Sequence, residues 1–582
     1  MNQTTLLTNS RSYYRRFYRL VVIAVIIMIA VITGSLLLGD SVRGTLTDRV
    51  NERLGKTETV ITSGTGFMSD EIMNSPILAK AKGYLLVDGF MSVNDKLIPI
   101  YIWGADEIEY GQSEINEPLA KKASISKDNL EGQSIIVHLP SHSLVPSGSL
   151  FVTKSYATQM RLEINGVRDI KHGGNLLLKN EQTLPLNVFV CREELCEMME
   201  IDSKINVILS EERVSDEQIA EIWNPSISGI SLTDTTLTSE RIFIQDEIVK
   251  SLNPDVRYFS YLVNDITTDR DTVPYSFVTA MTEWNGTSLS GNDIILADYT
   301  AKRLNVNKGD QVGMSYFISD DLKSLKTTAR TFVVKDIIPL DDIRKDKLLM
   351  TEFPGLSNVE TCTDWDSDLP INMDRIKKID EDYWYDYKQT PKAIVAYDAV
   401  IDDWGNSFGT ATALKGNWKQ TEGGSLIDSK ALITTVSPRE SGLYAAKHGT
   451  DFSSLFMALG FFIILSAILL IQNPLLEMFA LRKNEIDLYR QLGFKSKDIK
   501  LLLSREAFSV MLLASPIGII AGILYSGITL WLLGNVWSGA THTEGFALHI
   551  DPLTVIIGWA VGIFICAVSL QYIIGKQIKE KS

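Results

Sequence analysis

Four uncharged, apolar stretches constrain this sequence more than any other feature. They cover residues 20–39, 452–476, 507–534 and 552–575. Each has about the 20 residues that an α-helix needs to cross a ~30 Å hydrocarbon core. The sequence therefore predicts four transmembrane helices, with the long segment 40–451 inserted between the first helix and the second.

The first stretch also fits the apolar part of a secretory signal peptide, because arginines precede it. An uncleaved anchor is favoured, since the run is longer than the apolar core of a usual signal peptide. Beyond the stretch, Val42, Leu46, Val50 and Leu54 recur every four residues. This spacing predicts that the first span continues as a helical stalk.

The distribution of Lys and Arg predicts the orientation of these spans. Basic residues precede the first span within residues 1–19, lie between the second and third spans within residues 477–506, and follow the fourth within residues 576–582. The short loop 535–551 has none. Because basic residues concentrate on the cytoplasmic side, we expect both termini and residues 477–506 to be cytoplasmic and residues 40–451 to be extracytoplasmic.

The cytoplasmic segment between the second and third spans reads as a helical elbow. Pro474 is expected to bend or end the second span. Leu481, Leu488 and Leu492 form a stripe expected to face protein, with charged residues on the faces that meet water. Gly493 predicts a left-handed stop and Ser496 the cap of the next helix. In the third and fourth spans, the pairs Gly518 and Gly522, and Gly558 and Gly562, have the small-xxx-small spacing that permits close helix packing.

The segment 481–494, LRKNEIDLYRQLGF, resembles the signature of the FtsX-like permease family of ATP-binding-cassette (ABC) systems. The four-span plan with one large loop is similar as well. The resemblance implies a permease subunit without catalytic residues, in the bacterial cytoplasmic membrane, that transmits the motion of a separate ABC ATPase to the extracytoplasmic domain for export or release of a substrate. It implies an ATPase-coupling elbow formed by Arg482, Lys483, Glu485, Asp487, Arg490 and Gly493. It also implies a second permease copy or half, and leaves open whether this chain is a complete half or the first half of a longer permease.

Residues 40–451 predict a mixed α/β, β-rich domain with stalk helices at both ends, so the fold class is an α+β membrane protein. Their length predicts two subdomains, about 40–240 and 241–451. Segments with strand-like composition are 59–62, 85–87, 98–103, 134–138, 186–190 and 205–209. Residues 292–312 predict strand, short helix, a turn at Lys308-Gly309-Asp310, and strand, followed by the strand 331–338. This order resembles the MacB-like extracytoplasmic core domain. Aromatic residues such as Trp365, Trp384 and Trp404 are interpreted as packing residues rather than a ligand site.

Charge and motifs limit what the chain does by itself. The formal net charge is −15, and residues 40–451 alone carry −21, which argues against a nucleic-acid partner. No phosphate-binding Gly-x-x-x-x-Gly-Lys-Ser/Thr occurs, so ATP is expected to be used by the partner chain and no cofactor is expected here. His138 and His142 flank Pro140 and do not form a zinc motif. Cys191 and Cys196 either pair or remain buried thiols. A membrane-anchored ligand sensor and a membrane-tethered enzyme stay as alternatives, and the substrate is not indicated.

Overall fold

The computed structural model describes the 582-residue chain except residues 1–8, 65, 94–95, 128–129, 131, 140–157, 180–182, 320–324, 354–355, 358, 366–368, 419–425, 450, 537–544 and 580–582. His142 and parts of both predicted tails and of the loop 535–551 lie outside the described residues. The chain forms two compact units. The first contains residues 1–53, 177–184 and 439–582, and the second contains residues 54–176 and 185–438.

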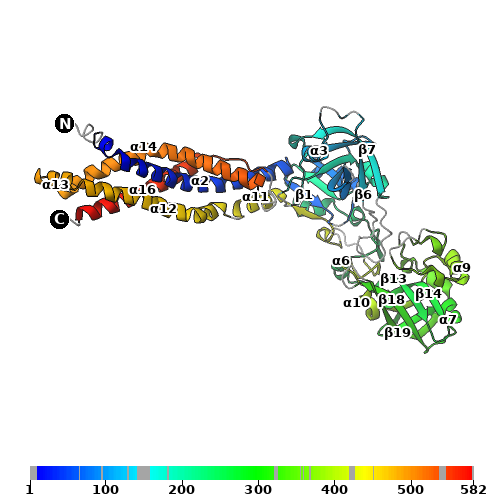
Figure 1. Ribbon diagram of the computed structural model, residues 1–582. Coiled ribbons are helices and arrows are strands. Elements are labelled where there is room, and N and C mark those ends of the chain that lie inside the picture. Colours follow the sequence, from blue (N-terminus) through cyan, green and yellow to red (C-terminus); the bar gives the residue numbers. More distant parts are fainter. Residues whose placement is uncertain are drawn as a thin grey trace. The chain divides into compact units, whose positions relative to one another are not determined.

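The first unit is a bundle of long helices (Figure 1). It contains α2 (Arg15–Leu54), α11 (Pro438–His448), α12 (Phe452–Leu481), α13 (Lys483–Gln491), α14 (Ser496–Trp531), which continues as the π-helical turn η9 (Leu532–Val536), and α16 (Pro552–Lys579). In the described part of the chain, four helices are long and apolar enough to cross a membrane, and each contains one predicted span. Within this unit, α13, the start of α2 and the end of α16 lie at the same end of the bundle (Figure 1).

Helix α2 is the most buried of the four apolar helices and packs against α14 and α16 through their glycines. A Cβ added at Gly518 or Gly562 would lie 2.9 Å from Ile29, and one added at Gly558 would lie 2.8 Å from Thr33. A Cβ added at Gly522 would lie 3.1 Å from the carbonyl oxygen of Ala30. The two glycine pairs therefore mark where α14 and α16 approach α2 most closely.

The structure confirms the stalk but corrects two helix boundaries. Helix α2 runs without a break to Leu54, with Val42 and Val50 buried along it. Pro474 does not end α12, which continues to Leu481 with the proline inside the helix. The N-cap of α14 is Lys495 rather than Ser496, and no side chain caps it. Water can satisfy the free amide groups at this exposed start.

The second unit contains two nine-stranded sheets among its described residues. The first consists of β22 (Thr434–Val436), β1 (Thr59–Thr62), β10 (Val207–Ser210), β3 (Ala81–Val93), β4 (Lys96–Ala105), β8 (Asn187–Cys191), β5 (Gln112–Asn116), β7 (Thr158–Arg168) and β6 (Ser134–Leu139), in that order. Because β6 also pairs with β3, the six strands from β3 to β8 close into a barrel, which we name barrel 1.

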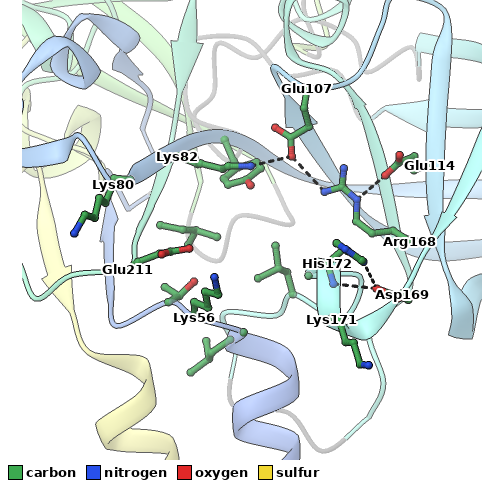
Figure 2. A pocket seen from close by; sticks show the side chains of 18 of the residues that line it. Lys56, Lys80, Lys82, Glu107, Glu114, Arg168, Asp169, Lys171, His172 and Glu211 are labelled. Atoms are coloured by element: carbon green, nitrogen blue, oxygen red, sulfur yellow. Dashed lines mark hydrogen bonds and ion pairs between the residues drawn. The ribbon is translucent and has the colours of Figure 1, made fainter.

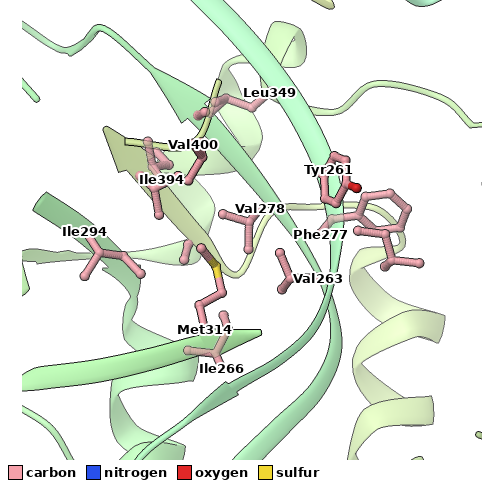
Figure 3. Packing of buried hydrophobic residues seen from close by; sticks show 14 of the residues in the cluster. Tyr261, Val263, Ile266, Phe277, Val278, Ile294, Met314, Leu349, Ile394 and Val400 are labelled. Carbon is pink, nitrogen blue, oxygen red and sulfur yellow. The ribbon is translucent and has the colours of Figure 1, made fainter. Parts of the chain in front are cut away.

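The second sheet has the same plan. Its order is β11 (Ile230–Leu232), β12 (Thr236–Ser239), β21 (Ala413–Lys415), β13 (Val256–Thr267), β14 (Thr272–Met281), β20 (Ala393–Ala396), β17 (Asp293–Ala297), β19 (Leu325–Ile338) and β18 (Gln311–Ser319). Strand β18 also pairs with β13 and closes barrel 2. Its interior holds apolar side chains such as Val263, Val278, Ile294, Met314 and Ile394 (Figure 3).

Each barrel consists of two copies of one strand-strand-strand-helix unit. The helices α3 (Glu117–Ala123), α4 (Arg192–Met198), α7 (Asp298–Leu304) and α10 (Tyr397–Trp404) each begin at the residue directly after the third strand. In both barrels the first two strands of a unit are antiparallel, and the second strand runs parallel to the third strand of the other unit. A register shift even recurs at the same place, between Ser113 and Glu114 in β5 and between Ile294 and Ile295 in β17. The two barrels are therefore repeats of one topology.

The repeat corrects the predicted division of the domain. The second sheet begins at Ile230, ahead of the predicted boundary near 240, and Thr434–Val436 returns to the first sheet. The predicted strand 205–209 is two strands, β9 (Lys204–Ile205) and β10, because the side chain of Asn206 interrupts it. Its amide oxygen accepts from the backbone N–H of Leu86 (2.7 Å) and its nitrogen donates to the Leu86 carbonyl (2.8 Å).

Other predictions for this domain are confirmed. Residues 292–312 form β17, α7, a turn and β18, and Gly309 has a φ of +93° in the turn. The carboxylate of Asp310 accepts from the backbone N–H of Asn307 at 2.8 Å. Trp384 and Trp404 are buried packing residues, as predicted. Cys191 and Cys196 are both free thiols, so the possible disulfide is not formed.

Candidate functional site

The elbow between α12 and α14 holds a buried cluster of charged and hydroxyl side chains at Arg482. Arg482 occupies the single position between α12 and α13, and its side chain is only 2% exposed. Its Nη2 donates to Glu506 Oε2 of α14 (3.0 Å) and to the hydroxyl of Ser10 (2.6 Å). Its Nε donates to Glu485 Oε2 of α13 (3.0 Å). One guanidinium group thus joins α13, α14 and the N-terminal segment before α2.

Hydroxyl groups complete the coordination of the two carboxylates. Tyr18 of α2 donates to Glu506 Oε1 at 2.9 Å, and Ser10 donates to the same oxygen at 2.7 Å. Tyr489 donates to Glu485 Oε1 at 3.0 Å. The guanidinium of Arg482 also lies 4.7 Å over the ring of Tyr14, a cation–π arrangement. We name Ser10, Tyr14, Tyr18, Arg482, Glu485, Tyr489 and Glu506 the Arg482 cluster.

Electrostatics keep Glu485 ionised and Tyr489 protonated. Burial alone would raise the pKa of Glu485, but hydrogen bonds and the charge of Arg482 outweigh it, so the pKa of Glu485 lies below its ordinary value. Burial and the neighbouring Glu485 charge raise the pKa of Tyr489 to about 12. Tyr489 is therefore a hydrogen-bond donor, and Glu485 an acceptor, throughout the physiological pH range.

The predicted elbow residues divide into two groups. The structure brings Arg482 and Glu485 together in the Arg482 cluster. Lys483 is exposed, Asp487 and Arg490 form a separate ion pair at 3.5 Å, and Gly493 provides the turn with a φ of +88°. Sequence reasoning missed Ser10, Tyr14, Tyr18, Tyr489 and Glu506. A carboxylate directly before the uncharged stretch 507–534 was a signal for Glu506, because such charges are costly near a membrane unless they are paired.

The apolar stripe of the elbow faces away from the rest of the unit. Leu481, Leu488 and Leu492 are 64%, 52% and 65% exposed rather than facing the rest of the unit. The inward face carries Ile486 and Tyr489, which pack against the apolar core, together with Glu485. The helix turns its charged Glu485 inward because Arg482 is there to pair with it, which leaves the leucines outside.

A second site in this structure is a cavity of about 900 Å³ in the second unit, beside barrel 1 (Figure 2). Arg168 forms part of its wall, with Nε donating to Glu114 (2.6 Å) and Nη1 to Glu107 (3.4 Å), and its guanidinium lies 4.1 Å over the ring of Phe189. Lys82 pairs with the same Glu107 at 3.6 Å. Burial, with the charge of Glu107, raises the pKa of Tyr84 in the same wall to about 12.

The charged wall of this cavity is not a requirement of the barrel fold. By the shared register, Ile295 and Ile338 of barrel 2 occupy the places of Glu114 and Arg168. Lysines 56, 80, 82 and 171 and Arg168 face a nearly equal set of acids, namely Glu107, Glu114, Asp169 and Glu211. A cavity with balanced charges does not select a ligand by the sign of its charge.

Comparisons with known proteins identify the C-terminal part of the chain. Residues 457–581 match the family described as FtsX-like permease C-terminal. The part of the chain from α12 to α16 is thus an FtsX-like permease domain, which confirms the resemblance seen in residues 481–494. Among solved structures, the periplasmic region of MacB from Actinobacillus actinomycetemcomitans matches 30% of this chain and 85% of its own, with 10% identity and a TM-score of 0.19. No curated protein matches the chain significantly.

Proposed function

We propose that the chain is the permease subunit of an ABC transporter in a bacterial cytoplasmic membrane. A separate ATPase subunit docks on the elbow, and the permease transmits its ATP-driven motion to residues 40–451, which act on a substrate outside the membrane. The subunit works with a second permease copy or a second permease half. The family match of residues 457–581 supports the permease assignment.

The Arg482 cluster is the observation that carries this proposal. Through Arg482, the short helix α13 is bonded to Glu506 of α14 and, through Glu506, to Tyr18 of α2. Because the side chains of Arg482 and Glu506 are 2% and 1% exposed, separating this ion pair costs several kcal/mol. A displacement of α13 is therefore passed to α2, a continuous helix of 40 residues and about 60 Å.

The outer face of the elbow, on and around α13, supports the docking of a protein. Leu481, Leu488, Leu492 and Phe494 are each half or more exposed, while charged residues surround them. Exposed apolar side chains grouped within one charged segment are typical of a protein-binding surface. Since α13, the start of α2 and the end of α16 lie at one end of the bundle, this surface is on the side that the basic residues assign to the cytoplasm (Figure 1).

The test is reconstitution of the full chain with its co-encoded ATPase. We expect Leu488→Asp to weaken binding of the ATPase at least tenfold and to abolish the permease-dependent change in ATP turnover, because burying a leucine contributes about 1.5–3 kcal/mol. Leu97→Asp, at a residue 60% exposed on β4, is the matched control and should bind normally. Equal binding by Leu488→Asp and wild type would contradict the proposed docking surface.

A further inference from the structure

The extended segment 545–549, which precedes α16, binds the outer half of α2 through hydrogen bonds of its backbone. The N–H of Ala547 donates to the hydroxyl of Thr45, and the N–H of His549 donates to the hydroxyl of Ser41, both at 3.0 Å. Ser41 in turn donates to the carbonyl of His549 at 3.2 Å. Ser41 and Thr45 are one helical turn apart and buried. Their hydroxyl groups satisfy the backbone hydrogen bonds of the extended segment, as a neighbouring strand would in a sheet.

Gly44 makes this approach possible. A Cβ added at Gly44 would lie 2.7 Å from the imidazole ring of His549, which is too close for any side chain. At the other end of the segment, the hydroxyl of Thr554 donates to the carboxylate of Asp40 at 2.5 Å. We name Ser41, Thr45, Asp48, Ala547 and His549 the outer clasp.

The imidazole of His549 faces an acceptor at each of its nitrogens. Nε2 lies 2.9 Å from Asp48 Oδ2 of α2, and Nδ1 lies 3.3 Å from the carbonyl oxygen of Ala547. A neutral imidazole carries one N–H and can satisfy only one of these acceptors, whereas the imidazolium ion donates to both. The geometry of the outer clasp therefore fits the protonated form best.

The other charged groups near the outer clasp do not remove this preference. On α2, Asp40 accepts from Thr554, and Arg43 pairs with Asp451 at 3.0 Å. Arg49, the residue after Asp48, also interacts with another group. Asp551, before α16, accepts from the backbone N–H of Leu553. Asp48 is thus the carboxylate bonded to His549, and the pair is half-exposed, at 37% and 54%.

We propose that the outer clasp responds to pH on the side of the membrane that holds residues 40–451. Protonation of His549 adds the second hydrogen bond and an ion pair with Asp48, which tightens the segment 545–549 against α2. Deprotonation loosens it. Imidazole is the side chain that most often changes charge in the physiological pH range, so the test compares pH values on either side of that range. The outer clasp is then a second, pH-dependent contact on α2, the helix that the proposed function assigns to the transmission of motion. This regulatory role rests on the proposed function.

Hydrogen exchange of the full chain in phosphatidylcholine nanodiscs tests the clasp directly, since the amides of Ala547 and His549 are its donors. After correction for intrinsic exchange rates, we expect protection of residues 545–549 about threefold higher at pH 5.5 than at pH 8, the effect of one exposed ion pair. In His549→Gln and Asp48→Asn the ratio should fall to about one. Thr45→Val should lower protection at both pH values, which shows that the peptide reports the clasp.

His448→Gln is the control. His448 lies on α11 of the same unit, with Nδ1 at 3.0 Å from the Tyr444 carbonyl, so the variant loses one imidazole and should keep the wild-type ratio. An unchanged ratio in His549→Gln, or higher protection at pH 8, would overturn the proposal. The exchange experiment needs no ATPase, so failure of the ATPase to dock would refute the proposed function while leaving this result intact. In the reconstituted complex, the pH dependence of ATP turnover should be lost in His549→Gln with docking preserved.

Discussion

Replacement of Arg482 by methionine tests the buried link between the elbow and the rest of the bundle. The side chains of Arg482 and Glu506 are 2% and 1% exposed, and their charged atoms lie 3.0 Å apart. In Arg482→Met, Glu506 keeps the hydroxyls of Ser10 and Tyr18 but loses its cation. Removing one partner of a buried ion pair costs about 3–5 kcal/mol, because the remaining charge stays desolvated.

The cost should appear as local opening of the elbow, since water reaches Glu506 when α13 separates from α14. We expect the amides of α13 to exchange at least about 100-fold faster in Arg482→Met than in wild type, at 1.36 kcal/mol for each factor of ten. The double variant Arg482→Met with Glu506→Leu removes both charges and should exchange within about tenfold of wild type. Hydrogen exchange with mass spectrometry on the full chain in nanodiscs gives these rates.

Arg490→Met is the matched control for the loss of an arginine on α13. Arg490 is 25% exposed, its pair with Asp487 spans 3.5 Å, and its Nη2 donates to the Ile578 carbonyl at 3.3 Å. Because these contacts are partly exposed, its removal should cost about 1 kcal/mol and raise exchange about fivefold. The reasoning would be refuted if Arg482→Met and Arg490→Met accelerated exchange equally. It would also be refuted if the double variant opened as readily as the single one.

Two further predictions concern stability. Gly558→Leu should destabilise the bundle by about 1–3 kcal/mol, because the new side chain meets Thr33, whereas Gly527→Leu, whose nearest neighbour is Leu548 at 3.9 Å, should cost little; thermal unfolding in detergent compares them. Burial lowers the pKa of Lys392 in barrel 2 to about 8, so the folded state loses this proton before the unfolded chain does and stability should rise between pH 8 and about 10.4. Lys392→Met should remove this rise and stabilise the domain at pH 7 by about 3 kcal/mol, measured by denaturant unfolding of the full chain.

The long-range organisation could be predicted from the sequence because its signals are strong and local. Uncharged stretches of about 20 residues correspond to the four apolar helices, and the four-residue spacing of Val42 to Leu54 corresponds to the continuation of α2. Gly309 and Gly493 mark turns with positive φ at the expected places. Of the two outcomes expected at Pro474, a bend or a helix end, the helix end is not seen, because inside a long apolar helix packing stabilises the helix beyond a residue that would break an isolated one.

The elbow shows why the site itself was only partly predictable. Periodicity places Leu481, Leu488 and Leu492 on one face, but it does not say whether this face meets the bundle or the outside. The direction depends on Arg482, whose partner Glu506 is 24 residues away and whose other contacts lie near residue 10. Such partners come together only in the folded bundle, so a local pattern can mark Glu506 as a charge that needs a partner but cannot say which residue pairs with it.

The repeat of the two barrels was not predicted from the sequence either. Corresponding positions hold Glu114 and Arg168 in one barrel and Ile295 and Ile338 in the other, so the side chains at these two places do not reveal the repeat. The shared feature is the order and direction of strands, which depends on alternation and turns more than on particular side chains. Only the pairing register and its recurring shift reveal the relationship.

The unbroken helix α2 limits how many residues can be inserted into it. It contacts the Arg482 cluster at Tyr18 and the outer clasp at Ser41 and Thr45, and no break separates these positions. Each residue turns an α-helix by about 100°, so the two contacts have a fixed rotational phase. One residue inserted between them would swing the outer contacts to another side of the bundle, whereas seven would return them to within about 20°.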